Sequence, residues 1–406
     1  MPPSYSKLFS DNFVGISCTD LVHPGESCSQ SLLKYILTDM PIGAMKFYFP
    51  VCFTSLLVNI KRWNELKTWI DFIKMLAKCL TFAGTFGLSI FGGLCLEYQF
   101  FKKYHYHFII WLPTVVASLT SIILPPPIIK AESLALFNFY IEYLIRSSRN
   151  GVVQKLKRSL LSGTVVFAAF NALVMCGMLK ARCPNFWFSK FTYSKDEKAK
   201  NTCQRIHTNL TCTNYLIKEL KQASSFALGF CVIKCILTCL GKLSSSPLTI
   251  LKVFFKSFDF KLFTFIAGID GIFKILFCLL NQKTSFNSIT NCGISSFIGG
   301  LTYVFFPRYE IFTLAISNAI TTFFRALINS YEKKKKEVPK IIEAIDKLPI
   351  YYLMLIAVVP VLMHNRLFYP YDVNQTVSNF LRLGSNGKDR DIIYRGISVF
   401  LGYKIK

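Results

Sequence analysis

The sequence predicts an all-helical, polytopic membrane protein, in which an internal repeat of glycine-rich helix pairs builds the helical bundle. Three observations predict this class. Apolar residues make up 52% of the 406 residues and charged residues only 17%, whereas an ordinary soluble domain carries roughly 25% charged residues. Mean hydropathy is +0.40. Several apolar runs also reach the roughly 18 to 20 residues that a helix needs to cross a bilayer.

Seven apolar runs predict membrane spans. In chain order they cover residues 42–60, 79–96, 107–124, 159–179, 223–240, 260–280 and 289–306. The alternative is a large soluble protein with buried helices. That alternative is disfavoured because soluble helices of this length normally keep a polar stripe, which residues 160–179 lack.

Two stretches of the chain share one plan about 180 residues apart. A glycine-rich run, a second apolar run and a proline follow one another in both: 79–96, 107–124 and Pro125 in the first copy, and 260–280, 289–306 and Pro307 in the second. A shorter apolar segment ending in arginine follows each proline, at 134–146 and 311–325. Self-similarity at a fixed spacing predicts a duplicated helical unit and a pseudo-symmetric bundle.

These features divide the chain into five segments. They are an N-terminal segment with cysteine and histidine (1–46), the first membrane repeat and a following span (47–179), a basic cysteine-containing loop (180–222), a span and the second membrane repeat (223–330), and a basic C-terminal region (331–406). Prolines and acidic residues interrupt the first forty residues, so we expect no signal peptide.

The net charge of +25 gathers in the links between predicted spans. Membrane proteins set their orientation in this way, so nucleic acid is not an expected partner. The basic links share one side of the membrane if segments 134–146 and 311–325 do not cross, and the two copies are then parallel, which we favour. If both segments cross, the copies are inverted. Loop 180–222, with nine basic residues, departs from the pattern.

Small residues recur four positions apart in the repeat helices. The pairs are Ala83 and Gly87, Ser89 and Gly93, Ala267 and Gly271, Ser295 and Gly299, and Ser296 and Gly300. Such pairs let helix backbones approach closely in lipid, where no hydrophobic force drives association. We interpret them as packing within the monomer. A pore lining, or a helix face through which the chain forms oligomers, is the alternative.

Charged residues inside the predicted spans are candidates for a functional polar path. Asp270 and Lys274 are four residues apart on one helix, which predicts an intramembrane ion pair, because an isolated charge at that depth costs at least about 2.5 kcal/mol. Glu142 and Arg146 have the same spacing, whereas Lys234 has no partner four residues away. Snorkelling to the interface and a role in moving a substrate are the alternatives to structural pairing.

The fourteen cysteines form no recognisable metal motif. Cys18, His23 and Cys28 offer ligand atoms in the N-terminal segment, as do four residues around the long loop, Cys183, Cys203, His207 and Cys212. No C-x-x-C pair occurs, and three ligands do not close a tetrahedral site, so we expect no metal and no cofactor. The usual motifs of hydrolases, kinases and dinucleotide enzymes are also absent, so we expect no catalytic residues and no enzyme activity.

Several segments together resemble the transmembrane protein 135 family, also called peroxisomal membrane proteins. They are the stretch CTDLVHPGESC at 18–28, the cysteine-bearing stretch 203–239 with YLIK at 215–218, the helix 263–279 and the glycine-rich helix 293–306. The resemblance covers most of the chain. The family's glycine-rich helices are in turn similar to those of mitochondrial inner-membrane translocases.

The resemblance implies a peroxisomal membrane location, with the mitochondrial membrane as an alternative or additional site. It also implies a role in the balance of mitochondrial fission and fusion and in peroxisomal or lipid metabolism. We therefore expect a non-enzymatic regulator whose partners are the lipid bilayer and organelle-dynamics proteins. A transporter or translocase for lipid, metabolite or polypeptide is the alternative. The lysine run 333–336 and the short links depart from the family pattern.

Overall fold

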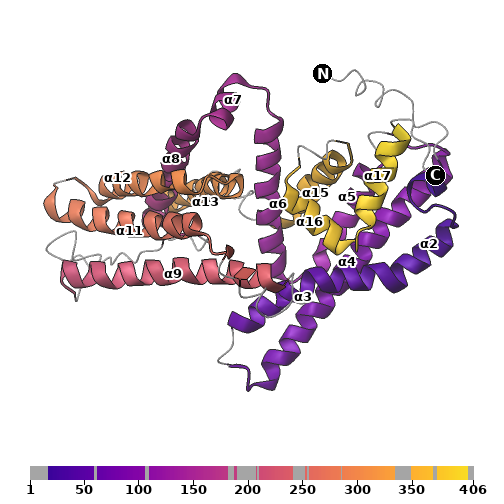
Figure 1. Ribbon diagram of the computed structural model, residues 1–406, viewed down its shortest axis with the longest axis horizontal. Helices are drawn as coiled ribbons and strands as arrows, with labels where there is room; N and C mark the ends of the chain where they lie inside the picture. Colours follow the sequence, from indigo (N-terminus) through magenta and orange to yellow (C-terminus); the bar gives the residue numbers. More distant parts are fainter. Residues whose placement is uncertain are drawn as a thin grey trace. The chain divides into compact units, whose positions relative to one another are not determined.

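The computed structural model describes residues 17–58, 62–105, 109–181, 187–189, 207, 210–240, 252–253, 256–284, 286–333, 349–368 and 373–400. Within these ranges the chain forms helices and no strand, which confirms the all-helical class. The chain divides into two compact units (Figure 1). Unit 1 comprises Met1–Ser147 and Ala344–Lys406, and unit 2 comprises Ser148–Glu343. The division of the sequence into five segments stays a prediction.

The first part of unit 1 contains a helix whose hydrogen-bonding pattern changes along its length. Helix α2 (Cys28–Lys34) runs through a π-helical stretch, η1 (Tyr35–Asp39), into α3 (Met40–Val58). Pro41 lies just after η1 and has no N–H to donate to the carbonyl four residues earlier, which accounts for the local change. Helix α3 packs against α4 (Leu66–Phe101), which has 36 residues.

The rest of unit 1 combines helices from both ends of the chain. Helix α5 (Trp111–Leu119) ends in a 3-10 turn, η3 (Thr120–Ile123), and α6 (Pro126–Ser147) follows. Helix α15 (Ile350–Phe368), from the C-terminal part of the chain, packs against both α5 and α6. Short helices complete the unit: α1 (Cys18–Leu21), α16 (Gln375–Gly384) against α3, and α17 (Lys388–Phe400) against α1.

Unit 2 uses helices from the middle of the chain. After α7 (Gly151–Arg158) come five longer elements and a turn: α8 (Leu160–Ala181), α9 (Cys212–Leu240), α11 (Phe260–Lys283), α12 (Ser288–Gly300) with its 3-10 turn η5 (Leu301–Phe305), and α13 (Tyr309–Lys333). Helices α9, α11 and α12 lie side by side, and α8 packs against both α12 and α13 (Figure 1). In unit 2, α8 thus packs against two other helices, as α15 packs against α5 and α6 in unit 1.

Five helices of the described part of the chain are long and apolar enough to cross a membrane: α4, α8, α11, α13 and α15. Large apolar side chains on them stay exposed. Leu161 of α8 and Phe323 of α13 expose 73% and 70% of their surface. Contiguous apolar surface of this kind is costly in water and ordinary in lipid. The structure therefore fits a multi-pass membrane protein.

The structure differs from the predicted seven spans. Runs 107–124 and 289–306 contain α5 and α12, which have 9 and 13 residues and are too short to cross a bilayer as single helices. Both helices tighten into 3-10 turns before Pro125 and Pro307, because a residue that precedes proline is driven out of the helical region. Conversely, α13 and α15 reach spanning length although the sequence analysis did not count them.

Candidate ligand cavity and buried polar sites

Unit 1 contains an apolar cavity of about 270 Å³ among α3, α4, α6, α15, α16 and α17. Aromatic and aliphatic side chains line most of it, among them Tyr35, Phe82, Phe86 and Leu355. Small-molecule sites usually have volumes of about 300 to 1,000 Å³, so this cavity suits a slender group such as a hydrocarbon chain better than a bulky ligand.

Polar atoms without a hydrogen-bond partner lie around the same cavity, although Arg366 and Asp389 form an ion pair of 4.0 Å. Within the part of the chain that the structure describes, four buried atoms of cavity-lining residues have no hydrogen-bond partner: Ser121 Oγ, Glu132 Oε1, Arg366 Nε and Asp389 Oδ2. An unsatisfied buried polar atom costs about 1 to 3 kcal/mol. A ligand with a polar group at one end of an apolar chain would recover part of this cost. The arrangement can therefore bind an amphipathic molecule.

The small residues of the first copy lie where α4 meets its neighbours. Ala83 and Gly87 line the cavity, and a Cβ added to Gly87 would collide with the ring and hydroxyl of Tyr35. A Cβ added to Gly93 would lie 2.8 Å from the Cβ of Pro113 in α5. A real Cβ atom does not come closer than about 3 Å to a non-bonded heavy atom. These helix contacts therefore require glycine at both positions. Ser89 donates a hydrogen bond of 2.7 Å to a carbonyl of its own helix.

Two glycines of the second copy let α12 contact its neighbours in unit 2. A Cβ added to Gly299 would lie 2.9 Å from the carbonyl oxygen of Ile269 in α11. A Cβ added to Gly300 would lie 2.7 Å from the Cα of Ala168 in α8. In both cases the obstacle is a backbone atom, which a side-chain rotation cannot remove.

The other small residues of the second copy have milder surroundings. A Cβ on Gly271 would lie 3.0 Å from the Leu220 side chain of α9, and Ala267 is half-buried. Ser295 and Ser296 are fully buried, and their hydroxyls donate to carbonyls one turn earlier in α12, at 2.7 and 2.6 Å. All these contacts lie within unit 2.

Asp270 and Lys274 belong to a larger buried network in unit 2. Lys274 Nζ lies 2.9 Å from Asp270 Oδ2 and 2.6 Å from Glu219 Oε2 of α9. The Ser189 hydroxyl donates to the other oxygen of Asp270 at 2.5 Å. One lysine thus serves two carboxylates. Sequence spacing missed Glu219 and Ser189 because they lie 55 and 81 positions from their partners.

Two further ion pairs lie in the two units, and sequence spacing identifies only some of their residues. In unit 1, Arg146 Nη2 lies 2.6 Å from Glu142 Oε1, and Asn374 donates to the second oxygen of this buried carboxylate. In unit 2, Lys234 lies 2.6 Å from Asp259. Lys234 has no partner one helical turn away, as the sequence indicates, and its partner lies instead on the segment that leads into α11.

Two groups of side chains bring metal-ligand atoms to within 4.8 Å of one another: Cys18, His23, Cys28 and Cys95 in unit 1, and His207, Cys212 and Cys278 in unit 2. Three of the ligands in unit 1 lie in the N-terminal segment, where the sequence places them, and the fourth is Cys95 of α4. The Cys95 thiol lowers the pKa of the Cys18 thiol to about 6, against the opposite effect of burial. Cys183 and Cys203 lie outside the described residues.

Comparison with known proteins does not assign this chain to a family. No protein-family model, curated protein or solved structure matches the chain. The resemblance to the transmembrane protein 135 family therefore stays a proposal, and the functional inference starts from the cavity and the buried polar groups.

Proposed function

We propose that this chain is a multi-pass organelle membrane protein that binds an amphipathic lipid in unit 1 and acts in lipid handling without catalysing a reaction. The cavity carries this proposal. Its apolar lining suits a hydrocarbon chain. Atoms of Glu132, Arg366 and Asp389 that have no hydrogen bond, the last two in an ion pair of 4.0 Å, would offer hydrogen bonds to a head group. Membrane helices around the cavity would let a lipid enter from the bilayer.

The proposed location is the peroxisomal membrane, with the mitochondrial membrane as an alternative or additional site. The family resemblance of segments 18–28 and 293–306 supports this location. In such membranes, a lipid-binding protein would influence peroxisomal or lipid metabolism and the balance of mitochondrial fission and fusion. Its proposed partners are the bilayer itself and proteins of organelle dynamics.

The duplication of the chain is the second part of the proposal. Each copy would contain five helical elements in the same order: the continuous helix α2–η1–α3, then α4, α5, α6 and α8 in the first, and α9, α11, α12, α13 and α15 in the second. The third helix of each copy ends in a 3-10 turn before a proline, which supports the correspondence. Because α8 packs in unit 2 and α15 packs in unit 1, the copies would exchange their fifth helices.

Lipid binding can be tested on the purified full chain in nanodiscs with a photoactivatable fatty acid. We expect crosslinks to peptides of α4 and α6. The change Ala83→Phe places a ring in the cavity and should reduce crosslinking several-fold. Ala77→Phe, on an exposed position of the same helix, is the matched control and should leave crosslinking unchanged. Equal crosslinking of both variants would refute the cavity as the binding site.

A transporter or translocase is the second candidate. The buried network of Glu219, Lys274 and Asp270 favours it, because ionisable groups inside a membrane bundle often mark a substrate path. Reconstitution into liposomes separates the two functions. A lipid-binding regulator gives no substrate-dependent flux, whereas a transporter gives flux that is lost in a folded variant with the three charges replaced.

A further inference from the structure

We propose that Cys18, His23, Cys28 and Cys95 form a structural zinc site, which fastens the N-terminal segment of unit 1 to α4. The four residues come from α1, the loop after it, the first residue of α2 and the membrane helix α4. Three thiolates and one imidazole form a common ligand set of closed, tetrahedral zinc sites. The site is separate from the lipid cavity, so either proposal can fail without the other.

The distances between the ligand atoms fit one ion at their centre. Cys18 Sγ lies 3.0 Å from His23 Nε2 and 3.3 Å from Cys95 Sγ, and Cys28 Sγ lies 3.2 Å from His23 Nε2. No pair of ligand atoms is more than 4.8 Å apart. Zinc bonds of about 2.3 Å to sulfur and about 2.0 Å to nitrogen place tetrahedral ligands about 3.5 to 3.8 Å apart. The three distances given above are slightly shorter than this value, and the upper limit of 4.8 Å for all pairs is longer.

The histidine presents the nitrogen that a metal needs. His23 Nδ1 lies 2.8 Å from the backbone carbonyl oxygen of Glu26. A carbonyl oxygen only accepts, so Nδ1 carries the proton and the lone pair of a neutral ring is on Nε2. Nε2 is the atom that faces the sulfurs of Cys18 and Cys28. Metal-binding histidines almost always have a second hydrogen bond of this kind.

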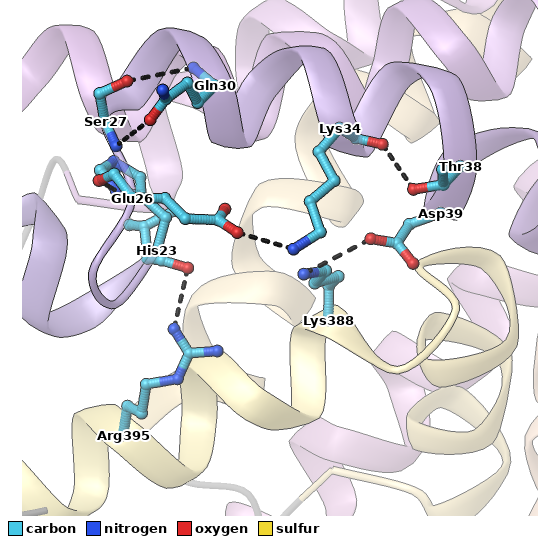
Figure 2. Close-up of polar contacts among 10 residues, drawn as sticks. His23, Glu26, Ser27, Gln30, Lys34, Thr38, Asp39, Lys388 and Arg395 are labelled. Carbon is cyan, nitrogen blue, oxygen red and sulfur yellow. Dashed lines mark hydrogen bonds and ion pairs between the residues drawn. The ribbon is translucent and has the colours of Figure 1, made fainter.

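Contacts that involve no metal hold the ligand loop in place (Figure 2). Ser27 and Gln30 cap the start of α2 reciprocally, and Glu26 forms an ion pair of 2.6 Å with Lys34. Arg395 of α17 donates to two backbone carbonyls of the segment that precedes the histidine, at 3.2 and 2.9 Å. The chain therefore positions the loop before any ion binds.

The cluster in unit 2 has the same design. His207 Nδ1 lies 2.9 Å from the carbonyl oxygen of Leu210, three residues on, and Nε2 lies 3.6 Å from Cys278 Sγ. Cys212 follows its histidine by five positions, as Cys28 does, and the membrane-helix cysteine follows 66 positions later, against 67 in unit 1. Thiols gathered only by apolar packing have no reason to recur with the same histidine tautomer and the same spacing.

The test is the zinc content of the full chain, purified in detergent with reducing agent and dialysed against a weak chelator. We expect at least one tightly held zinc per chain, and Cys95→Ser should lose about one equivalent, because three remaining ligands do not close the site. Cys52→Ser is the matched control. Cys52 is also a buried thiol of unit 1, and its Sγ lies 3.9 Å from Cys79 Sγ, outside the cluster. It should retain the zinc.

Cobalt keeps the proposal testable if Cys95→Ser does not fold. The parent chain is stripped with a strong chelator and reloaded with cobalt, and we expect the absorption bands of thiolate-bound, tetrahedral cobalt. A parent chain with far less than one zinc and no such bands overturns the proposal. So does a Cys95→Ser variant that keeps the full zinc content. A disulfide between Cys18 and Cys95, found by alkylation and mass spectrometry, would also overturn it.

Discussion

If the chain is duplicated as proposed, the two units carry side chains of opposite character at corresponding positions. Cys28 and Cys212 begin α2 and α9, and seven residues later stand Tyr35 and Glu219. Counted back from the membrane-helix cysteines Cys95 and Cys278, the residues four and eight positions earlier are Phe91 and Gly87 in unit 1, and Lys274 and Asp270 in unit 2. Under the proposed duplication, an apolar trio in one unit would correspond to a charged trio in the other.

The contacts of the two trios explain why only one of them borders the cavity described above. In unit 1, the ring centroid of Tyr35 lies 4.2 Å from that of Phe91, its hydroxyl lies over Gly87, and all three residues line the cavity. In unit 2, the lysine joins two carboxylates and binds α9 to α11 through charge. If the two units are copies of one unit, the same helical framework supports either an apolar site or an ionic crosslink.

The largest expected effect comes from removing the shared lysine. Lys274→Ala leaves the buried carboxylate of Asp270 and the half-buried carboxylate of Glu219 without their cation and should destabilise the protein by about 3 to 5 kcal/mol. Asp270→Ala should cost less, because Lys274 keeps Glu219 as a partner. Steady-state level and thermal melting in detergent measure both. If Asp270→Ala proves as harmful as Lys274→Ala, the lysine is not shared as the distances indicate.

The next effect comes from the glycine contacts of unit 2. Gly299→Leu pushes a side chain against the backbone of α11 and should cost about 1 to 3 kcal/mol, the usual range for overpacking. Gly229→Leu is the control, because nothing lies within 4 Å of a Cβ at that position of α9. Measuring protein abundance together with organelle morphology distinguishes a packing role of the glycine from a pore lining. Normal abundance of Gly299→Leu would contradict the packing role, and normal abundance with lost flux would indicate a pore.

Converting the charged trio into the apolar one tests the correspondence itself. The triple change Glu219→Tyr, Asp270→Gly and Lys274→Phe should change stability by no more than about 1 kcal/mol. Apolar replacement of a buried ion pair is often neutral or stabilising, and the new helical glycine costs about 1 kcal/mol. A melting temperature close to that of the parent would support equivalent positions. A triple variant as unstable as Lys274→Ala would show that the units are not equivalent there.

The sequence predicts the helical class and some helix ends well, because these depend on local chemistry. Pro125 and Pro307 end the runs before them, as the geometry of proline requires. Hydropathy is a poorer guide to helix length. It finds the run 79–96 but not the start of α4 at Leu66, because Lys67 and Lys74 lower the local hydropathy without interrupting the helix.

The candidate sites were harder to predict, because their residues are far apart in the sequence. Cys95 lies in an apolar run, where a lone cysteine is usually a packing group, so three ligands were counted instead of four. One signal was available: Cys95 and Cys278 stand at nearly the same distance from Cys28 and Cys212. No comparable signal identifies Glu219 or Ser189 as partners of the α11 charges, since only the folded chain brings α9 and α11 together.

The smallest expected effect on stability accompanies a test of orientation. If α4, α8, α11 and α13 cross the membrane, the start of α4 and the end of α13 face the same side, and the two glycine-rich helices run parallel. Lys67→Cys and Ser330→Cys, both at exposed positions, should change stability by less than about 0.5 kcal/mol and react alike with an impermeant maleimide in intact organelles, above the labelling of the parent chain. We expect that side to be the cytosol, because basic links favour it.

Phe101→Cys, at the other end of α4, should react only after permeabilisation. Labelling of Lys67→Cys and Ser330→Cys from opposite sides would contradict this topology and require an additional crossing between them. The copies would then be inverted rather than parallel if that crossing lies between α4 and α11.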